Sequence, residues 1–201
     1  MIKPARLLTS PEFFNLLRLR NRRTAKKIDG RILARSARNL AILVSDSSGF
    51  TRRTREYGIL PFLSVMTKCY DRLLPRIGRK RGLCISHNAD NILAVFEDPA
   101  DAVAAAVDMH RRLARHNRGK AARDRFHVCI GIHYGTVVRL ADNVYGDPVN
   151  VAAKIGEDLA ARDEILVTQE VAELVRKKFR ITYSRSTELG GRTLELYRIV
   201  Y

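Results

Sequence analysis

One short acidic turn has the residue types needed to bind a metal ion and a phosphate. Residues 46–51 read Asp-Ser-Ser-Gly-Phe-Thr and follow an apolar run at residues 39–44. A carboxylate at the end of a buried strand, followed by a glycine turn and by Thr51 at the start of a helix, lies beside free backbone N–H groups. Such a turn can hold a divalent cation through the acid and a phosphate through the amides. An ordinary helix N-cap is the alternative.

A second acid, Asp90, lies between two short apolar runs, residues 83–85 and 92–96. The polar residues between these runs indicate a hairpin with Asp90 at its tip. Two carboxylates at strand ends of one sheet, Asp46 and Asp90, can share one or two Mg²⁺ ions, which bridge a triphosphate and lower the pKa of an attacking hydroxyl. A tip aspartate without a ligand is the alternative.

A third set of polar residues lies in the segment 143–154. Asn143 precedes the sequence YGDPVNVAAK at residues 145–154, in which Asn150 and Lys154 are four positions apart. This spacing places both side chains on one face of a helix, where an amide one turn from a cation suits a ribose oxygen beside a phosphate. Read alone, the segment also fits a solvated helix face.

The elements that must position these residues follow from the spacing of apolar side chains. The Ser10 hydroxyl is expected to cap a first short helix, ahead of Pro11 and Glu12. Strands separated by helices, with hairpins among them, predict an α+β sandwich with a mostly antiparallel sheet and flanking helices. Helices are predicted from residue 10, at 60–77, 99–116, 146–159 and 169–179, and strands at 39–44, 83–85, 92–96, 128–135, 165–167, 180–187 and 193–200.

Charge divides the 201 residues into an arm and a domain. The chain carries 37 Lys and Arg against 21 Asp and Glu, a formal net charge of +16. More than half of that excess lies in residues 1–38. We predict a basic N-terminal arm with a short helix at residues 1–38 and one globular domain at residues 39–201. Residues 18–38, which are basic and weakly periodic, form either a linker or mobile arm or a structured contact with a dimer mate or another partner.

Cysteine spacing and hydropathy exclude other classes of protein. Cys69, Cys84 and Cys129 form no CxxC pair, which argues against a disulfide framework or a zinc site. No apolar run approaches the ~18 residues of a membrane span, so we expect a cytoplasmic protein without one. Net charge is the only feature that favours nucleic-acid binding, so no stable nucleic-acid partner is expected.

Taken in order, these segments resemble the catalytic domain of class III nucleotidyl cyclases, the adenylate and guanylate cyclase family. The resemblance covers residues 39–201. It rests on DxxGFT at residues 46–51, on Asp90 before a strand, on GIHYG at residues 131–135 and on YGxxVNxAxK at residues 145–154. It implies a class III cyclase-like sandwich with a ferredoxin-like core and a nucleotidyl cyclase domain at residues 39–201.

The resemblance also implies a two-metal mechanism in a head-to-tail homodimer with shared active sites. Asp46 and Asp90 would hold two Mg²⁺ or Mn²⁺ ions, while Asn150 and Lys154 act from the other subunit. The 3′-hydroxyl of a nucleoside triphosphate would attack its own α-phosphorus and release pyrophosphate. The other residues expected at the substrate are Phe50, which lines the base pocket or packs in the core, and Thr51, Ser86, Asn143 and Arg192.

Several positions depart from the family pattern. The departures concern the base pocket, the second metal acid and the phosphate-binding cations. They are Ser86 in place of a lysine, Asn143 in place of an aspartate, Ala89 in place of a glycine, Lys154 in place of an arginine, and Gly190 in place of a lysine whose role Arg192 can take.

These departures have two explanations. The first is loss of activity, which leaves a silent cyclase-like module that binds nucleotide. The second is a changed base, because Ser86 and Asn143 both donate and accept hydrogen bonds and can read a smaller pyrimidine edge. Small cyclases of this kind resemble the pyrimidine cyclases of bacterial anti-phage (Pycsar-type) signalling, which make cyclic CMP or cyclic UMP. We therefore predict UTP or CTP as substrate, with a purine cyclase of atypical base pocket as the alternative.

Overall fold

One mixed sheet forms the centre of the molecule. The computed structural model describes residues 6–88 and 90–201. The strands follow the order β2-β3-β1-β4-β6-β8-β7, with β5 paired to β4. Only the β4–β6 pairing is parallel among these strands. The strands are β1 (Ala37–Ser47), β2 (Leu83–Asn88), β3 (Asn91–Phe96), β4 (Val128–Arg139), β5 (Val144–Tyr145), β6 (Ile165–Thr168), β7 (Arg180–Leu189) and β8 (Arg192–Val200).

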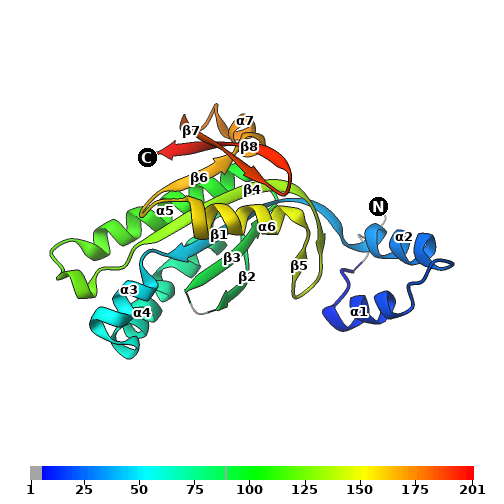
Figure 1. The fold of residues 1–201 in the computed structure, drawn as a ribbon, viewed down its shortest axis with the longest axis horizontal. Coiled ribbons are helices and arrows are strands. Elements are labelled where there is room, and N and C mark those ends of the chain that lie inside the picture. Colours follow the sequence, from blue (N-terminus) through cyan, green and yellow to red (C-terminus); the bar gives the residue numbers. More distant parts are fainter. Residues whose placement is uncertain (1–5, 89) are drawn as a thin grey trace.

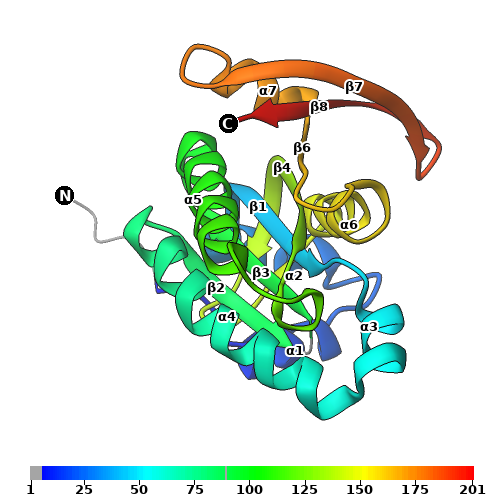
Figure 2. The same cartoon turned by 90° about the vertical axis from the view of Figure 1, so that its left-hand side faces the viewer.

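Helices cover both faces of this sheet (Figures 1 and 2). Figure 2 shows α4 (Ile59–Arg79) and α5 (Pro99–Asn117) on one side of β1 and α6 (Asp147–Lys154) on the other. Strand β1 serves both cores, because Ala41 and Leu43 face one cluster while Ile42 and Val44 face the other. Burial on two faces explains why its apolar residues form a continuous run. The remaining helices are α1 (Ser10–Arg18), α2 (Ala25–Ser36), α3 (Phe50–Tyr57), the 3₁₀ turn η1 (Ala122–Asp124), the π-helical turn η2 (Ile155–Leu159) and α7 (Gln169–Val175).

The predicted α+β sandwich with a mostly antiparallel sheet is confirmed. The structure differs from the prediction at the start of the first helix. Thr9 caps α1, and its hydroxyl and backbone form a capping box with Glu12, whereas the Ser10 hydroxyl donates to Asp142 at 2.9 Å. The prediction of Ser10 as the cap is therefore wrong, because a tertiary partner binds that hydroxyl.

The N-terminal segment is structured rather than a linker within its described residues. Residues 25–36, which lie within the segment 18–38, form α2. Together α1 and α2 bury a small apolar cluster against the β4–β5 region, in which the Phe13 ring stacks on Tyr145 at 5.6 Å. The boundary at residue 38 stays a prediction, although β1 begins at Ala37. Residues 1–5 of the predicted arm lie outside the described residues.

A close backbone contact holds η2 against the sheet. A Cβ on Gly131 of β4 would lie 2.4 Å from the backbone nitrogen of Gly156, and one on Gly156 would lie 2.7 Å from the carbonyl oxygen of Val44. Real Cβ atoms do not approach this closely, so glycine is required at both positions. The contact brings the start of η2 beside the end of β1.

Candidate active site

The end of β1 brings the two predicted metal acids together. Asp46 is the penultimate residue of β1 and lies opposite Asn91, the first residue of β3. Asp90 directly precedes Asn91, and its carboxylate accepts a hydrogen bond of 3.1 Å from the Ser47 hydroxyl. The antiparallel register of β1 and β3 therefore places both carboxylates at one edge of the sheet.

The surroundings of Asp46 disfavour its charged form. Partial burial raises the pKa of Asp46 to about 7, and the negative charges of Asp90 and Glu157 add to this effect. Burial also raises the pKa of Glu157 above its usual range, with Asp158 contributing. Carboxylates crowded in this way gain from a cation that neutralises them.

These donors fit a magnesium or manganese ion that shares its coordination with substrate. Within residues 6–88 and 90–201, no three His, Cys, Asp or Glu side chains are grouped to hold a metal by themselves. Mg²⁺ does not need such a cage, because it is bound through one or two carboxylates together with waters and substrate phosphates. Asp46 and Asp90 could supply such a pair of hard oxygen donors.

The turn after Asp46 opens a helix, as predicted. Gly49 adopts a left-handed conformation with φ of 81° and precedes α3. The Ser48 amide donates to the carbonyl of His127 at 2.9 Å, so the amides left for a phosphate are those of the first turn of α3. Thr51 lies there and is exposed. The Phe50 ring contacts Phe62 edge-on at 5.1 Å and packs against the core.

The two residues expected to read the base lie on different parts of the sheet. Ser86 belongs to β2, beside an irregularity in its pairing with β3, and not to the hairpin turn. Asn143 precedes β5; its amide donates to the Tyr145 hydroxyl at 3.0 Å and accepts from the Val144 amide at 2.8 Å. Asn143 is thus held in place by its own strand. The departure at Ala89 falls outside the described residues.

The predicted catalytic cations are paired with acids of the same chain. Lys154, at the end of α6, forms an ion pair of 2.6 Å with Asp158. Arg192, at the start of β8, forms an ion pair with Asp147 at the start of α6. Asn150 is exposed on α6. In the described part of the chain, neither Asn150 nor Lys154 hydrogen bonds to Asp46 or Asp90.

Sequence reasoning missed several polar partners around the site. The Asn91 amide donates to Glu157 at 2.8 Å, which links η2 to the strand that follows Asp90. Asp158 forms an ion pair with Lys154, and Asp147 forms one with Arg192. The sequence could have indicated one of these pairs: Asp158 lies four residues after Lys154, and that spacing favours an ion pair on a helix.

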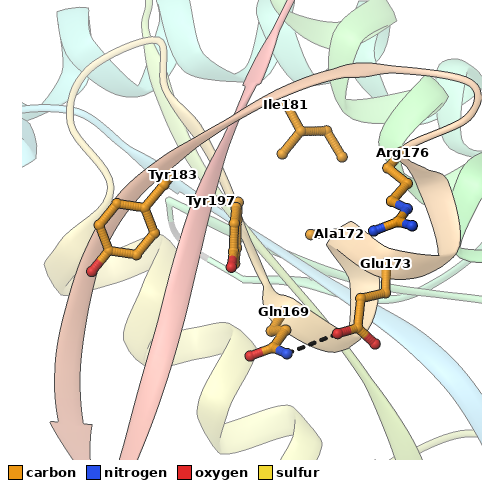
Figure 3. Close-up of a pocket in the computed structure, with 7 residues that line it drawn as sticks. All are labelled: Gln169, Ala172, Glu173, Arg176, Ile181, Tyr183 and Tyr197. Atoms are coloured by element: carbon orange, nitrogen blue, oxygen red, sulfur yellow. Dashed lines mark hydrogen bonds between the residues drawn. The ribbon is translucent and has the colours of Figure 1, made fainter.

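A separate cavity of about 270 Å³ lies between α7 and the β7–β8 ribbon. Figure 3 shows Tyr183 and Tyr197 on the ribbon side and Arg176 on the helix side. None of the predicted site residues lines this cavity, so it does not belong to the candidate active site.

Comparison with known sequences decides the family. A sequence model of the adenylate and guanylate cyclase catalytic domain matches residues 32–200. The chain belongs to this cyclase family. Two curated relatives of this cyclase domain are the serine/threonine-protein kinase pkn2 of Myxococcus xanthus, 32% identical over 165 residues, and an adenylate cyclase of Anabaena cylindrica, 33% identical over 159 residues.

These matches cover most of the cyclase domain but little of the relatives. They span 80% and 69% of this chain, and 20% and 31% of the Myxococcus and Anabaena proteins. Among solved structures, an adenylate/guanylate cyclase/hydrolase from Silicibacter pomeroyi has a TM-score of 0.73 at 23% identity, and the alignment covers 82% of this chain and 98% of that one. The resemblance to the class III nucleotidyl cyclase fold is therefore confirmed.

Within residues 6–88 and 90–201, no helix is both long enough and apolar enough to cross a membrane.

Proposed function

We propose that this cyclase domain converts a nucleoside triphosphate into a 3′,5′-cyclic nucleotide and pyrophosphate. The observation that carries the proposal is the pair of carboxylates, Asp46 and Asp90, held together at a strand end beside the opening turn of α3. Bound Mg²⁺ or Mn²⁺ would lower the pKa of the 3′-hydroxyl and neutralise phosphate charge.

The chain's own residues then supply position and charge. The free amides at the start of α3 favour an anionic phosphate group through the helix dipole. Lys154 offers a point charge to the reacting phosphate, without the bidentate contact of an arginine. Asn150, one turn away on α6, suits a ribose oxygen, and Arg192 suits the triphosphate tail.

A homodimer with shared sites fits this arrangement of polar groups. Asn150 is exposed, and Lys154 and Arg192 are bound to Asp158 and Asp147 rather than to the acids of β1 and β3. A second, head-to-tail copy would bring its α6 to Asp46 and Asp90 and complete the site. Substrate phosphates would then compete with Asp147 and Asp158 for the two cations.

For the base, we propose a pyrimidine. Ser86 and Asn143 are neutral groups, and the local hydrogen bonds of Asn143 fix its amide. The product, cyclic UMP or cyclic CMP, would act as a second messenger in anti-phage defence. A purine substrate with an atypical pocket is the alternative. Plaque counts on bacteria that express wild type or Asp46→Asn test the defence role, and equal counts would exclude it.

A catalytically silent module is the second candidate function. The ion pairs of Lys154 and Arg192 within the chain favour it, because both cations are already neutralised. One assay separates the two: purified protein is given each of the four nucleoside triphosphates with Mn²⁺ or Mg²⁺, and cyclic product and pyrophosphate are measured. We expect product from UTP or CTP that is lost in Asp46→Asn. No product from any of the four would establish the silent module.

Mixing two inactive variants tests the shared site. Asp46→Asn removes a metal acid, and Lys154→Met removes a cation that would act from the other subunit. A mixed dimer contains one intact site, so an equal mixture should recover about a quarter of wild-type activity. A mixture as inactive as its parts would show that all these residues act within one chain.

A further inference from the structure

The helical hairpin at the N-terminus has an outer surface that the cyclase reaction does not use. This basic hairpin comprises α1, α2 and the residues 19–24 that join them. Figure 1 shows it at one end of the long axis of the molecule, beside β5.

The two faces of the basic hairpin differ in composition. Its inner face buries Phe13, Leu16, Ile28 and Ile32 against the β4–β5 region. Apolar side chains are also exposed: Leu19 is 63% exposed and Leu33 50%, whereas Phe14, 43% exposed, meets the Tyr145 ring edge-on at 6.2 Å. Two leucines left in water on so short a segment indicate a surface that another partner covers.

Exposed basic residues occupy the same short segment as these apolar side chains. Between residues 18 and 31 the outer surface carries seven exposed basic residues, and the one acid in this stretch, Asp29, is bound to Arg20 at 2.7 Å. The exposed bases are Arg18, Arg20, Arg22, Arg23, Lys26, Lys27 and Arg31.

On α2 the charges follow the helical period. Lys27 and Arg31 are four residues apart, and Ala34 follows three residues later, all exposed. Ile28 and Ile32 lie on a separate, buried face, about a third of a turn away. The helix is therefore apolar toward its own domain and cationic, with Leu33 at its end, toward the outside.

We propose that the basic hairpin docks on the surface of an anionic lipid bilayer. Lys and Arg near a membrane are attracted by acidic headgroups, and exposed Leu and Phe side chains enter the boundary between headgroups and acyl chains. Two other occupants fit less well. Pairing with the basic hairpin of a second copy would bring two strongly cationic surfaces together. A nucleic acid would pair with the basic side chains but leave Leu19 and Leu33 in water.

Vesicle sedimentation tests this docking without reference to nucleotide chemistry. The full chain is mixed with vesicles of phosphatidylcholine alone or with roughly one third phosphatidylglycerol. We expect at least about tenfold stronger binding to the anionic vesicles, with a marked loss at high salt. Equal binding to both vesicle types, or none to either, would overturn the proposal.

Two pairs of charge substitutions locate the surface. Arg22→Gln with Arg23→Gln removes two charges from the basic hairpin, and Arg176→Gln with Lys177→Gln removes two exposed charges near the end of α7. Both variants have the same net charge. We expect the first to weaken binding to anionic vesicles about tenfold and the second to leave it within about twofold. Equal losses in both would show that net charge alone binds the lipid.

An apolar substitution separates a bilayer from a nucleic acid. Leu19→Ser with Leu33→Ser keeps every charge and alters only side chains that are at least half exposed, so the melting temperature should fall by no more than about 4 °C. We expect weaker vesicle binding and unaltered binding to duplex DNA or RNA. Unaltered vesicle binding, or a nucleic acid that outcompetes anionic vesicles, would overturn the lipid assignment.

Discussion

The pKa of Asp46 differs between the folded and the unfolded chain. Burial, with the charges of Asp90 and Glu157, raises its pKa from 3.8 to about 7. Between these two values the folded state binds more protons than the unfolded state. The free energy of unfolding contributed by Asp46 therefore falls as pH rises through this window. A divalent cation would reverse this trend by stabilising the charged form.

Asp46→Asn should therefore stabilise the protein at alkaline pH in the absence of metal. Because Asp46 is only half-buried, water screens part of the effect, and we expect a gain of about 1 to 2 kcal/mol at pH 8 that disappears near pH 4. Urea unfolding of wild type and variant with a chelator present measures it. Added Mn²⁺ should stabilise wild type more than the variant, and an identical response to Mn²⁺ would argue against Asp46 as a ligand.

Lys154 should matter for catalysis and little for stability. Its ion pair with Asp158 is about half exposed on both sides, and such pairs contribute little. We expect Lys154→Met to change the free energy of unfolding by at most about 0.5 kcal/mol and to lower the turnover number by about 10² or more. Lys177→Met, another exposed lysine, is the matched control. A loss of turnover in the control would point to general electrostatics.

At the scale of elements, the placement of η2 depends on glycine. The contact of Gly131 and Gly156 lets η2 approach β4 and β1, and the Asn91–Glu157 hydrogen bond then ties η2 to β3. Three elements that are distant in sequence thus meet beside Asp46. The position of the metal acids is therefore coupled to the packing of η2.

Gly156→Ala should separate η2 from the sheet. Its Cβ would meet the Val44 carbonyl oxygen at 2.7 Å, and we expect a loss of about 2 to 3 kcal/mol in the free energy of unfolding. Gly78→Ala in α4 is the control, because nothing lies within 4 Å of that Cβ and alanine favours a helix by about 1 kcal/mol. Chemical denaturation measures both. Equal stability of the two variants would contradict the tight contact.

Elements with strong periodicity were predictable, and elements defined by distant contacts were not. The helices at residues 60–77 and 99–116 and the strand before Asp46 correspond to α4, α5 and β1, because their apolar spacing reflects direct burial. In α2 the buried apolar residues are only Ile28 and Ile32 among many bases, so the stripe was too sparse to separate a helix from a linker. The π-helical geometry of η2 has no sequence period of its own.

The candidate active site also combines features that the sequence could predict with features that depend on distant contacts. The meeting of Asp46 and Asp90 was predictable, because hairpin topology brings strand ends together. The pairing of Arg192 with Asp147 joins residues from two elements, and nothing in their local sequences indicates it. The roles of Phe50, Thr51, Ser86, Asn143, Asn150, Lys154 and Arg192 in catalysis and substrate binding stay predictions.

At the scale of the whole molecule, the part of the +16 net charge that lies in residues 39–201, which is +7, concerns substrate capture. A triphosphate is strongly anionic, and a positive field raises its local concentration around the protein. Salt screens this field over about 10 Å at 0.1 M. The attraction acts before the chemical step, so it affects binding and not turnover.

We therefore expect the Michaelis constant for the nucleoside triphosphate to rise about threefold or more between low salt and roughly 0.3 M salt, with an unchanged turnover number. Steady-state kinetics at constant free Mn²⁺ measures both. A turnover number that falls while the Michaelis constant stays fixed would show that salt acts on the assembled site instead.

The central position of β1 also has a consequence for biosynthesis. Ile42 pairs with Val95 on one side and with His133 on the other, so both neighbours of this strand are synthesised long after it. Such non-local pairing slows folding. Until β4 leaves the ribosome, an apolar segment built for burial on two faces remains unpaired, which is the kind of segment that aggregates. We expect the nascent chain to need chaperone protection until residue 139 has emerged.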